Sequence, residues 1–300
     1  MKLLKKTILS LCAITAVFIV VLIIPIDPAR GEGRYRTSDL APVILEADTL
    51  ELLTLNVAHG RGTALNQILV SATQHRKNLE EIASILLASG AQVVALQEAD
   101  APSLWSGKFD HVEYLAEATG YRFSAHGYHA SAWPFTYGAA LMSKPRMSDT
   151  HSHSFRPTWP TATKGYVRGT IRWRNGEDEG SVQAVTLVSV HLDFSSEKVR
   201  KAQIGELVDD LGELPTPLII MGDFNADWSS DDSPVRQLAN AIGLAAFRPT
   251  TQEFSTYKGI KRLDWILISD ELKFINYAIL PNIVSDHLAV VAKIGWEEHH

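Results

Sequence analysis

The segment Leu218-Ile219-Ile220-Met221-Gly222-Asp223-Phe224-Asn225 joins a short apolar run to polar side chains at its end. Four consecutive apolar residues bounded by a turn signal predict a buried β-strand. An aspartate directly after such a strand is common as a turn former, so this segment alone does not establish a site. The pattern becomes informative because the chain repeats it.

Four other apolar runs also end in a carboxylate, an amide or an imidazole. They are Leu-Thr-Leu-Asn at 53–56, Val-Ala-Leu-Gln-Glu at 94–98, Leu-Val-Ser-Val-His-Leu-Asp at 187–193 and Ile-Val-Ser-Asp-His at 283–287. Strand ends at one rim of a sheet converge on a common crevice. We therefore expect the polar side chains of all five segments to form one site, rich in oxygen and containing two histidines.

The chain alternates strands with a small number of helices. Strands are expected at residues 51–57, 92–96, 139–143, 166–173, 182–190, 218–221, 263–268 and 288–294. Helices are expected at residues 66–89 with Gly90 at the end, at 197–214 before Pro215, and from the cap Ser233 with Pro234 in the first turn. Many strands with few crossover helices predict mixed sheets packed face to face and flanked by helices.

The N-terminus predicts a membrane anchor. Three lysines within the first six residues precede an uncharged apolar stretch at 8–26, which is long enough to span a thin bilayer. A cleavable signal peptide is the alternative, but a cut after Ala29 would put Asp27 at a disfavoured position. The basic flank keeps the N-terminus in the cytoplasm and exports the rest of the chain.

We therefore expect an uncleaved signal anchor at residues 1–30, a polar linker at 31–48 and a catalytic domain at 49–296. One transmembrane helix would precede the domain and hold it at the membrane, outside the cytoplasm. This topology predicts a single-pass membrane protein.

Composition and charge narrow the function. The 300-residue chain is 46% hydrophobic and 21% charged, which is ordinary for a globular protein. Its single cysteine, Cys12, excludes intramolecular disulfides and Cys-based zinc sites. The chain carries a net charge of −6, and the first 42 residues hold six Lys and Arg but only three Asp and Glu, so the remainder is more acidic. Duplex nucleic acid is thus the less favoured substrate, although a local basic patch stays open.

Six motifs in order resemble the endonuclease/exonuclease/phosphatase family, which includes DNase I-like nucleases, neutral sphingomyelinases and inositol polyphosphate 5-phosphatases. They are Leu-Asn-Val at 55–57, Leu-Gln-Glu at 96–98, Val-His-Leu-Asp at 190–193, Gly-Asp-Phe-Asn at 222–225, Leu-Asp-Trp-Ile at 263–266 and Ser-Asp-His at 285–287. The resemblance implies a four-layer α/β sandwich of two packed mixed β-sheets flanked by helices. It also implies a magnesium-dependent attack of water on a phosphate ester.

The resemblance assigns a metal site to three residues. Glu98 is the expected Mg²⁺ ligand, with Asn56 beside it and Asp286 near the metal. Their oxygens suit a hard cation, and Mn²⁺ is the expected substitute. A turn cap is the alternative for Asn56, and the choice between one and two ions stays open.

The resemblance also assigns the catalytic groups. His287, paired with Asp264, is the expected general base, because a carboxylate partner fixes the imidazole tautomer and raises its basicity. Asp223 and Asn225 would orient the water and hold a phosphate oxygen, and in some family members the aspartate is the base. The alternative for Asp264 is a salt bridge to Arg262.

His191 would donate to the phosphate or to the leaving group. In several relatives a glutamate from the middle of the chain supports this histidine, but residues 137–143 here are mostly small or apolar. Asp193 is a local alternative partner, and a purely structural histidine at a strand end is a further alternative. Two residues that follow the first motif, His59 and Arg61, are candidates for contact with phosphate.

The loops leave the substrate class open. Residues 122–137 and 151–168 mix aromatic with basic side chains, which suits stacked bases, a lipid headgroup or a solvated rim. The anchor and the acidic domain favour a membrane-tethered phosphodiesterase or phosphatase acting on a lipid headgroup or another small phosphoester. An exported nuclease is the alternative. A catalytically inactive binding module is disfavoured by the complete set of polar residues.

Overall fold

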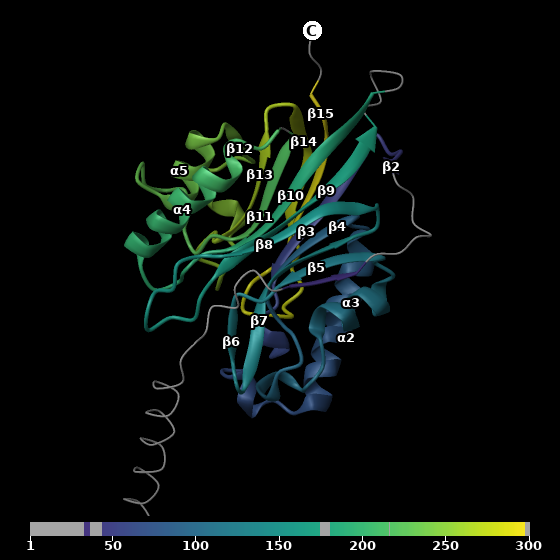
Figure 1. Cartoon of the computed structure of the whole chain (residues 1–300), viewed down its shortest axis with the longest axis vertical. Coiled ribbons are helices and arrows are strands. Elements are labelled where there is room, and N and C mark those ends of the chain that lie inside the picture. Colours follow the sequence, from purple (N-terminus) through teal and green to yellow (C-terminus); the bar gives the residue numbers. More distant parts are fainter. Residues whose placement is uncertain (1–32, 37–43, 175–180, 216, 298–300) are drawn as a thin grey trace, which may run out of the picture.

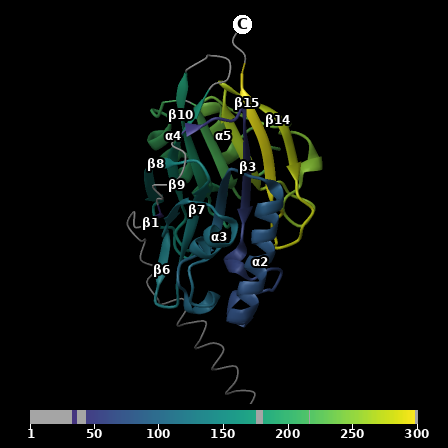
Figure 2. The same cartoon turned by 90° about the vertical axis from the view of Figure 1, so that its right-hand side faces the viewer.

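Two β-sheets pack face to face, and helices cover the outer face of each sheet (Figures 1 and 2). This computed structural model describes residues 33–36, 44–174, 181–215 and 217–297. The prediction of two packed mixed sheets flanked by helices is therefore confirmed.

The first sheet contains the strands that carry Asn56 and Glu98. Its order is β1 (Gly33–Arg36), β5 (Phe123–Gly127), β7 (Phe135–Ser143), β4 (Val93–Asp100), β3 (Thr49–Asn56), β15 (Val290–Trp296) and β14 (Leu272–Ile279), with β6 (Ala130–Ala132) beside β7. Only β3 and β4 run parallel among these described neighbours. The sheet is therefore mixed.

The second sheet contains the strands that carry His191, Asp223 and Asp264. Its order is β12 (Leu244–Ala246), β13 (Asp264–Ser269), β11 (Leu218–Asp223), β10 (Val182–His191), β9 (Gly165–Arg174) and β2 (Ile44–Leu45), with β8 (Met147–Ser154) beside β9. The β10–β11 and β2–β9 pairs are parallel. Two short strands, β1 and β2, lie in the range 31–48 that the sequence predicted as a linker, one in each sheet.

Four α-helices in the described part of the chain complete the layers. α2 (Ala72–Ser89) and α3 (His111–Thr119) cover the first sheet, and α4 (Glu197–Leu211) and α5 (Pro234–Ala241) cover the second. In β3, Leu50 and Leu52 pack in the core between the sheets, whereas Leu53 and Leu55 pack in the core that includes α2. Because both faces of β3 are buried from Leu52 onward, leucines lie on both faces and the strand gives no strict alternation of apolar and polar residues.

Several helix boundaries differ from the prediction for local reasons. α2 begins at Ala72 rather than near residue 66, because Ser71 accepts a hydrogen bond from the Gln74 N–H as the N-cap, and residues 67–69 form a separate 3₁₀ turn. Its end at Gly90, with φ of 69°, is as predicted. α4 ends at Leu211 rather than 214. Ser233 holds the cap position of α5, but its hydroxyl donates to the Asp227 carbonyl and does not cap the helix.

One end of the sandwich collects the polar strand ends. β3, β10 and β11 finish there at Asn56, His191 and Asp223, and the antiparallel β13 begins there at Asp264. β15 runs antiparallel to β3 and therefore ends, at Trp296, at the opposite end of the sandwich (Figure 1). We call the end that holds Asn56, His191, Asp223 and Asp264 the site end.

Within the described residues, no helix has the length and apolarity needed to cross a bilayer. The predicted anchor at residues 1–30 lies outside the described residues and stays a prediction.

Candidate active site

The strand register of the second sheet places three polar residues side by side. His191 is paired with Asp223 across β10 and β11, and Asp223 is paired with Asp264 across β11 and β13. Register partners on neighbouring strands point to the same face of a sheet. The residues two positions earlier on β11 and later on β13, Met221 and Ile266, belong to the core between the sheets. The three polar side chains therefore point toward the first sheet.

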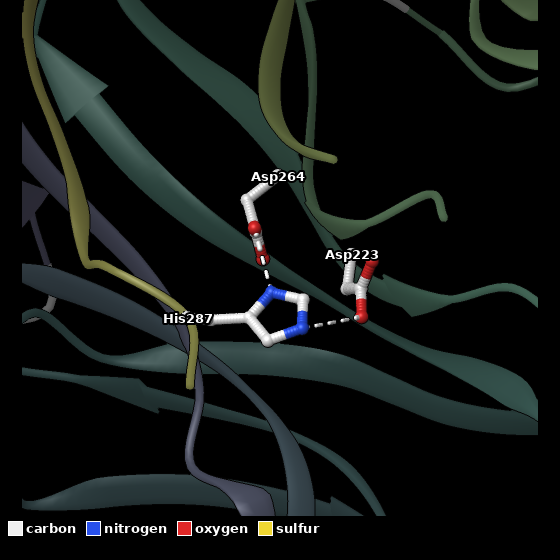
Figure 3. A group of neighbouring side chains, drawn as sticks. All are labelled: Asp223, Asp264 and His287. Carbon is white, nitrogen blue, oxygen red and sulfur yellow. Dashed lines mark hydrogen bonds and ion pairs between the residues drawn. The ribbon is translucent and has the colours of Figure 1, made fainter. Parts of the chain in front are cut away.

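His287 lies between two of these carboxylates (Figure 3). Its Nδ1 atom is 2.8 Å from Oδ2 of Asp264, and its Nε2 atom is 3.8 Å from Oδ2 of Asp223. The Ser285 hydroxyl donates to the Asn56 carbonyl and pins the loop that carries His287 to the end of β3. The structure thus brings together the Asp264–His287 pair that the sequence predicted.

Arg262, the alternative partner for Asp264, makes other contacts. The Arg262 guanidinium lies 3.9 Å from the centre of the Trp265 ring and donates to the carbonyls of Phe247 and Arg248. No contact joins Arg262 to Asp264 in the described part of the chain. The salt bridge weighed from the sequence is therefore absent.

Burial and charge shift the pKa values of His287 and Asp223, which face each other in this site. Burial by itself would lower the pKa of His287, but the charges of Asp264 and Asp223 raise it to about 10. Burial raises the pKa of Asp223 to about 7, with the charge of Asp264 adding to the effect and that of His287 opposing it. At neutral pH, His287 is therefore a cation and Asp223 is close to its titration point.

Two amides hold the Asp223 carboxylate. The Asn56 side chain donates to Oδ2 at 3.0 Å, the Asn225 backbone N–H donates to Oδ1 at 2.9 Å, and the Asn225 side chain donates to Oδ2 at 3.3 Å. Asn56 also accepts from the Ala58 N–H, so the turn-capping role weighed for it is present as well. Gly222 permits this strand end, because a Cβ there would lie 1.9 Å from the Val190 carbonyl oxygen.

Glu98 reaches the site through an irregularity in its strand. The β4–β7 register shifts between Leu96 and Ala99, and Glu98 has φ of 51°. Such a β-bulge re-aims a side chain that strict alternation would send to the other face. The Glu98 carboxylate lies 3.5 Å from Lys164 Nζ and 3.4 Å from His59 Nε2. Burial alone would raise the pKa of Glu98, but these two cations hold it well below its ordinary value.

A second histidine–aspartate pair supports Glu98. His59 Nδ1 lies 2.7 Å from Oδ1 of Asp100, and the other Asp100 oxygen accepts from Trp105 Nε1 and the Ser106 hydroxyl. The sequence offered His59 as a phosphate contact, and the structure gives it these carboxylate partners. Asp100 and Lys164 were missed as site residues, because their roles depend on the fold that brings them beside Glu98.

The remaining predicted residues have partners of their own. Asp286, a predicted metal ligand, pairs with Arg61 at 2.8 Å. Arg61, which the sequence offered as a phosphate contact, therefore binds a carboxylate in this structure. His191 Nε2 lies 3.4 Å from Oδ2 of Asp223. Burial and the nearby Lys164 charge lower the pKa of His191 well below its ordinary value, so this imidazole is neutral.

Asp193 is not the partner of His191. Its Oδ1 atom accepts from the backbone N–H groups of Ser195 and Ser196 and from the Ser195 hydroxyl, in the turn that leads into α4. The carboxylate that lies beside His191 is therefore that of Asp223 on the neighbouring strand, and not that of Asp193.

The donor set fits a hard divalent cation. The predicted ligands Glu98, Asn56 and Asp286 offer oxygen atoms, and Glu98 is ionised at neutral pH. Glu98 and Asp286 are also the more exposed carboxylates of the site, with 20% and 29% of their side chains accessible. Ligand atoms of Asp223, Asp264 and His287 lie within 4.8 Å of one another, but a protonated His287 has no lone pair for a metal. The metal site at Glu98, Asn56 and Asp286 stays a prediction.

Comparisons with known proteins agree with this geometry. The model of the endonuclease/exonuclease/phosphatase family matches residues 53–287. A search of curated proteins finds no match.

Solved structures share the fold at low sequence identity. An endonuclease/exonuclease/phosphatase from Beutenbergia cavernae superposes with a TM-score of 0.65 and 16% identity, covering 83% of this chain and 72% of its own. TDP2 from D. rerio, complexed with a single-strand DNA product, has a TM-score of 0.60 and 13% identity over 83% of this chain and 100% of its own. The mannosyl-6-phosphatase Bt3783 from Bacteroides thetaiotaomicron has a TM-score of 0.57 and 14% identity over 82% of this chain and 100% of its own.

Proposed function

The chain belongs to the endonuclease/exonuclease/phosphatase family, and from that premise we propose that it is a divalent-metal-dependent hydrolase in which water attacks the phosphorus of a phosphoester. The observation that carries this proposal is the environment of Asp223. This buried carboxylate is held by Asn56 and Asn225, faces the cationic His287 and has a pKa of about 7.

Asp223 is the base in this proposal. A general base works best when its pKa lies near the operating pH, and Asp223 meets that condition. His287, with a pKa of about 10, carries a proton at neutral pH. This pattern supports the alternative that the sequence left open, in which the aspartate accepts the proton of water.

Asp264 and His287 then act as a donor unit. The Asp264 carboxylate holds Nδ1, so the Nε2–H of the imidazolium points to the side of the site where Asp223 lies. A cationic donor stabilises negative charge that develops on phosphate oxygens in the transition state. His191, neutral and next to Asp223, is a second donor on the same side.

The metal would be held by Glu98, with Asn56 and Asp286 contributing oxygens, and when bound it supplies Lewis-acid polarisation of the phosphoryl group. Mg²⁺ is the ion proposed, with Mn²⁺ as its substitute. Arg61, which pairs with Asp286, and Lys164, which pairs with Glu98, add positive charge where an anionic substrate would arrive.

For the substrate we propose a lipid headgroup or another small phosphoester, hydrolysed by a domain tethered to the membrane through residues 8–26 and exported from the cytoplasm. The acidic chain, with a net charge of −6, supports this choice over duplex nucleic acid. A phosphatase of a phosphosugar is among the structural neighbours. An exported nuclease is the second candidate, and the neighbour solved with a DNA product favours it.

A substrate screen of the full chain in detergent micelles tests the proposal. Phospholipids, sphingomyelin, inositol phosphates, mannose 6-phosphate and single-stranded DNA would each be incubated with Mg²⁺, with Mn²⁺ and with EDTA. We expect turnover of a lipid or small phosphoester that needs the metal. Turnover that survives EDTA would refute metal dependence, and DNA as the preferred substrate would select the nuclease.

A further inference from the structure

Four segments at the site end expose large apolar side chains to solvent. They are residues 61–71 after β3, 128–134 with the β6–β7 turn, 155–164 before β9, and 255–262 before β13. Leu69, Trp133, Trp159 and Ile260, one from each segment, are 83%, 84%, 80% and 77% exposed. We call these four segments the apolar rim. Scattered apolar residues are normal on a surface, whereas a group on the loops at one end marks an interaction site.

The apolar rim borders the candidate active site. Residues 61–71 begin with Arg61, the partner of Asp286, and residues 155–164 end with Lys164, the partner of Glu98. The segment 255–262 leads into Asp264 and pairs with the loop of His287 through Tyr257. The β6–β7 hairpin reaches the same end of the molecule in both views (Figures 1 and 2). A surface that met the apolar rim would therefore also meet the side on which Glu98 is accessible.

The charge of the apolar rim differs from that of the chain. The four segments hold no Asp or Glu and six Lys and Arg residues, whereas the chain as a whole has a net charge of −6. Of the six, Lys164 and Arg262 are buried and Arg61 pairs with Asp286. Arg156, Lys258 and Lys261 are exposed beside Trp159 and Ile260. Basic and large apolar side chains on one surface are the combination that binds the interface of an anionic bilayer.

The position of β1, the first described strand, also supports a membrane near the site end. β1 begins at Gly33, which pairs with Gly127 at the last position of β5. β5 runs antiparallel to β7, and β7 runs antiparallel to β4, so β5 ends at the site end. The apolar stretch predicted as an anchor ends at residue 26, and seven residue steps to Gly33 span at most about 25 Å. A bilayer that held this stretch would lie within that distance of the site end.

We infer that the apolar rim docks on an anionic phospholipid bilayer and presents the site to headgroups of that same bilayer. The second clause rests on the proposed function, whereas docking itself does not. Single-stranded nucleic acid also binds basic and aromatic surfaces, but by stacking bases on rings. Leu69 and Ile260 offer no ring, and aliphatic side chains gain more from insertion among acyl chains.

An environment-sensitive fluorophore tests the docking step. The full chain would carry Cys12→Ser and a single new cysteine, either Trp159→Cys on the apolar rim or Ile275→Cys, an exposed residue of β14 near the opposite end. Each labelled protein is placed in lipid nanodiscs of phosphatidylcholine alone or with about one third phosphatidylglycerol. We expect a blue shift and a gain in intensity at position 159, stronger with the anionic lipid, and no change at 275. Equal responses at the two positions would overturn the inference.

A ratio of rates tests the second clause. Trp133→Ser with Trp159→Ser should lower the turnover of phospholipid in vesicles about tenfold relative to the turnover of soluble bis(p-nitrophenyl) phosphate. Leu87→Ser with Ile275→Ser, two exposed apolar residues away from the apolar rim, should leave the ratio unchanged. An unchanged ratio in the rim variant would overturn presentation of the site to the bilayer.

The outcomes separate this inference from the proposed function. A label response at position 159 in a protein that hydrolyses neither substrate supports docking and refutes the proposed hydrolase. A label that responds to a single-stranded oligonucleotide but not to nanodiscs overturns docking on lipid and favours nucleic acid.

Discussion

The carboxylate of Asp264 lies 2.8 Å from Nδ1 of His287, and this contact decides which nitrogen of the imidazole faces the rest of the site. Nε2 is left to point toward Asp223, 3.8 Å away. The two carboxylates on either side raise the pKa of His287 to about 10, against the effect of burial. The same contact that orients the ring therefore also keeps it protonated.

Asp264→Asn should lower kcat on the order of a hundredfold or more, because a neutral amide no longer stabilises the positive charge of His287 and no longer accepts from its Nδ1–H. His287→Ala should cost at least as much. The two losses should not add in the double variant, because both changes disable one unit. Steady-state kinetics of the three variants measures this, and a double loss equal to the product of the single losses would show that the residues act separately.

The rate should depend on pH through two groups. With Asp223 as the base and His287 as the cationic donor, kcat/KM should rise as pH passes about 7 and fall as it passes about 10. Asp223→Asn should remove the lower limb together with most of the activity. A profile measured from pH 5 to 11 that stays high below pH 6 would contradict Asp223 as the base.

Glu98→Gln should nearly abolish turnover while leaving the fold intact, because a neutral amide oxygen replaces the anionic ligand of a hard cation. Mg²⁺ binding measured by calorimetry should weaken in parallel with activity. Glu117→Gln, an exposed carboxylate on α3, is the matched control and should retain both. Ordinary magnesium affinity in Glu98→Gln would place the ion elsewhere.

His59→Gln should weaken Mg²⁺ affinity by roughly tenfold to a hundredfold without removing it, because His59 contacts the Glu98 carboxylate and is itself held by Asp100. Calorimetric titration separates this effect from a loss of stability, which a melting curve reports. If melting falls while magnesium affinity is unchanged, His59 has a purely structural role.

Acid should destabilise the fold through a buried histidine outside the site. Burial lowers the pKa of His129 to about 3, and its Nδ1 atom accepts from the Ala139 N–H. The unfolded chain binds a proton at this residue below about pH 6.5 and the folded chain does not, so stability falls as pH drops from there toward 3. His129→Gln should reduce that slope by up to about 1.4 kcal/mol per pH unit in urea unfolding. An unchanged slope would mean that other groups carry the effect.

The amino-acid sequence by itself determined much of the fold and most of the residues of the site. Of the five apolar runs with polar ends, three do finish as strands, at Asn56, His191 and Asp223, and these residues lie at one end of the sandwich. β4 continues past Glu98 to Asp100, and residues 283–287 form a loop before β15 rather than a strand end. These features were readable because each depends on a few adjacent residues. Short elements could not be read from the sequence. α3 has only nine residues, and β1 and β2 are strands only because they pair with β5 and β9.

The tertiary structure alone decided the electrostatics of the site. The bulge that re-aims Glu98 exists in the pairing of β4 with β7, and the contacts of Glu98 with Lys164 and His59 join segments far apart in the chain. A pKa likewise depends on burial and on charges brought near by folding, so no local pattern could assign a proton to His287 or a pKa of about 7 to Asp223. Residue types and order determined which groups could act, and packing decided which of them carries the proton.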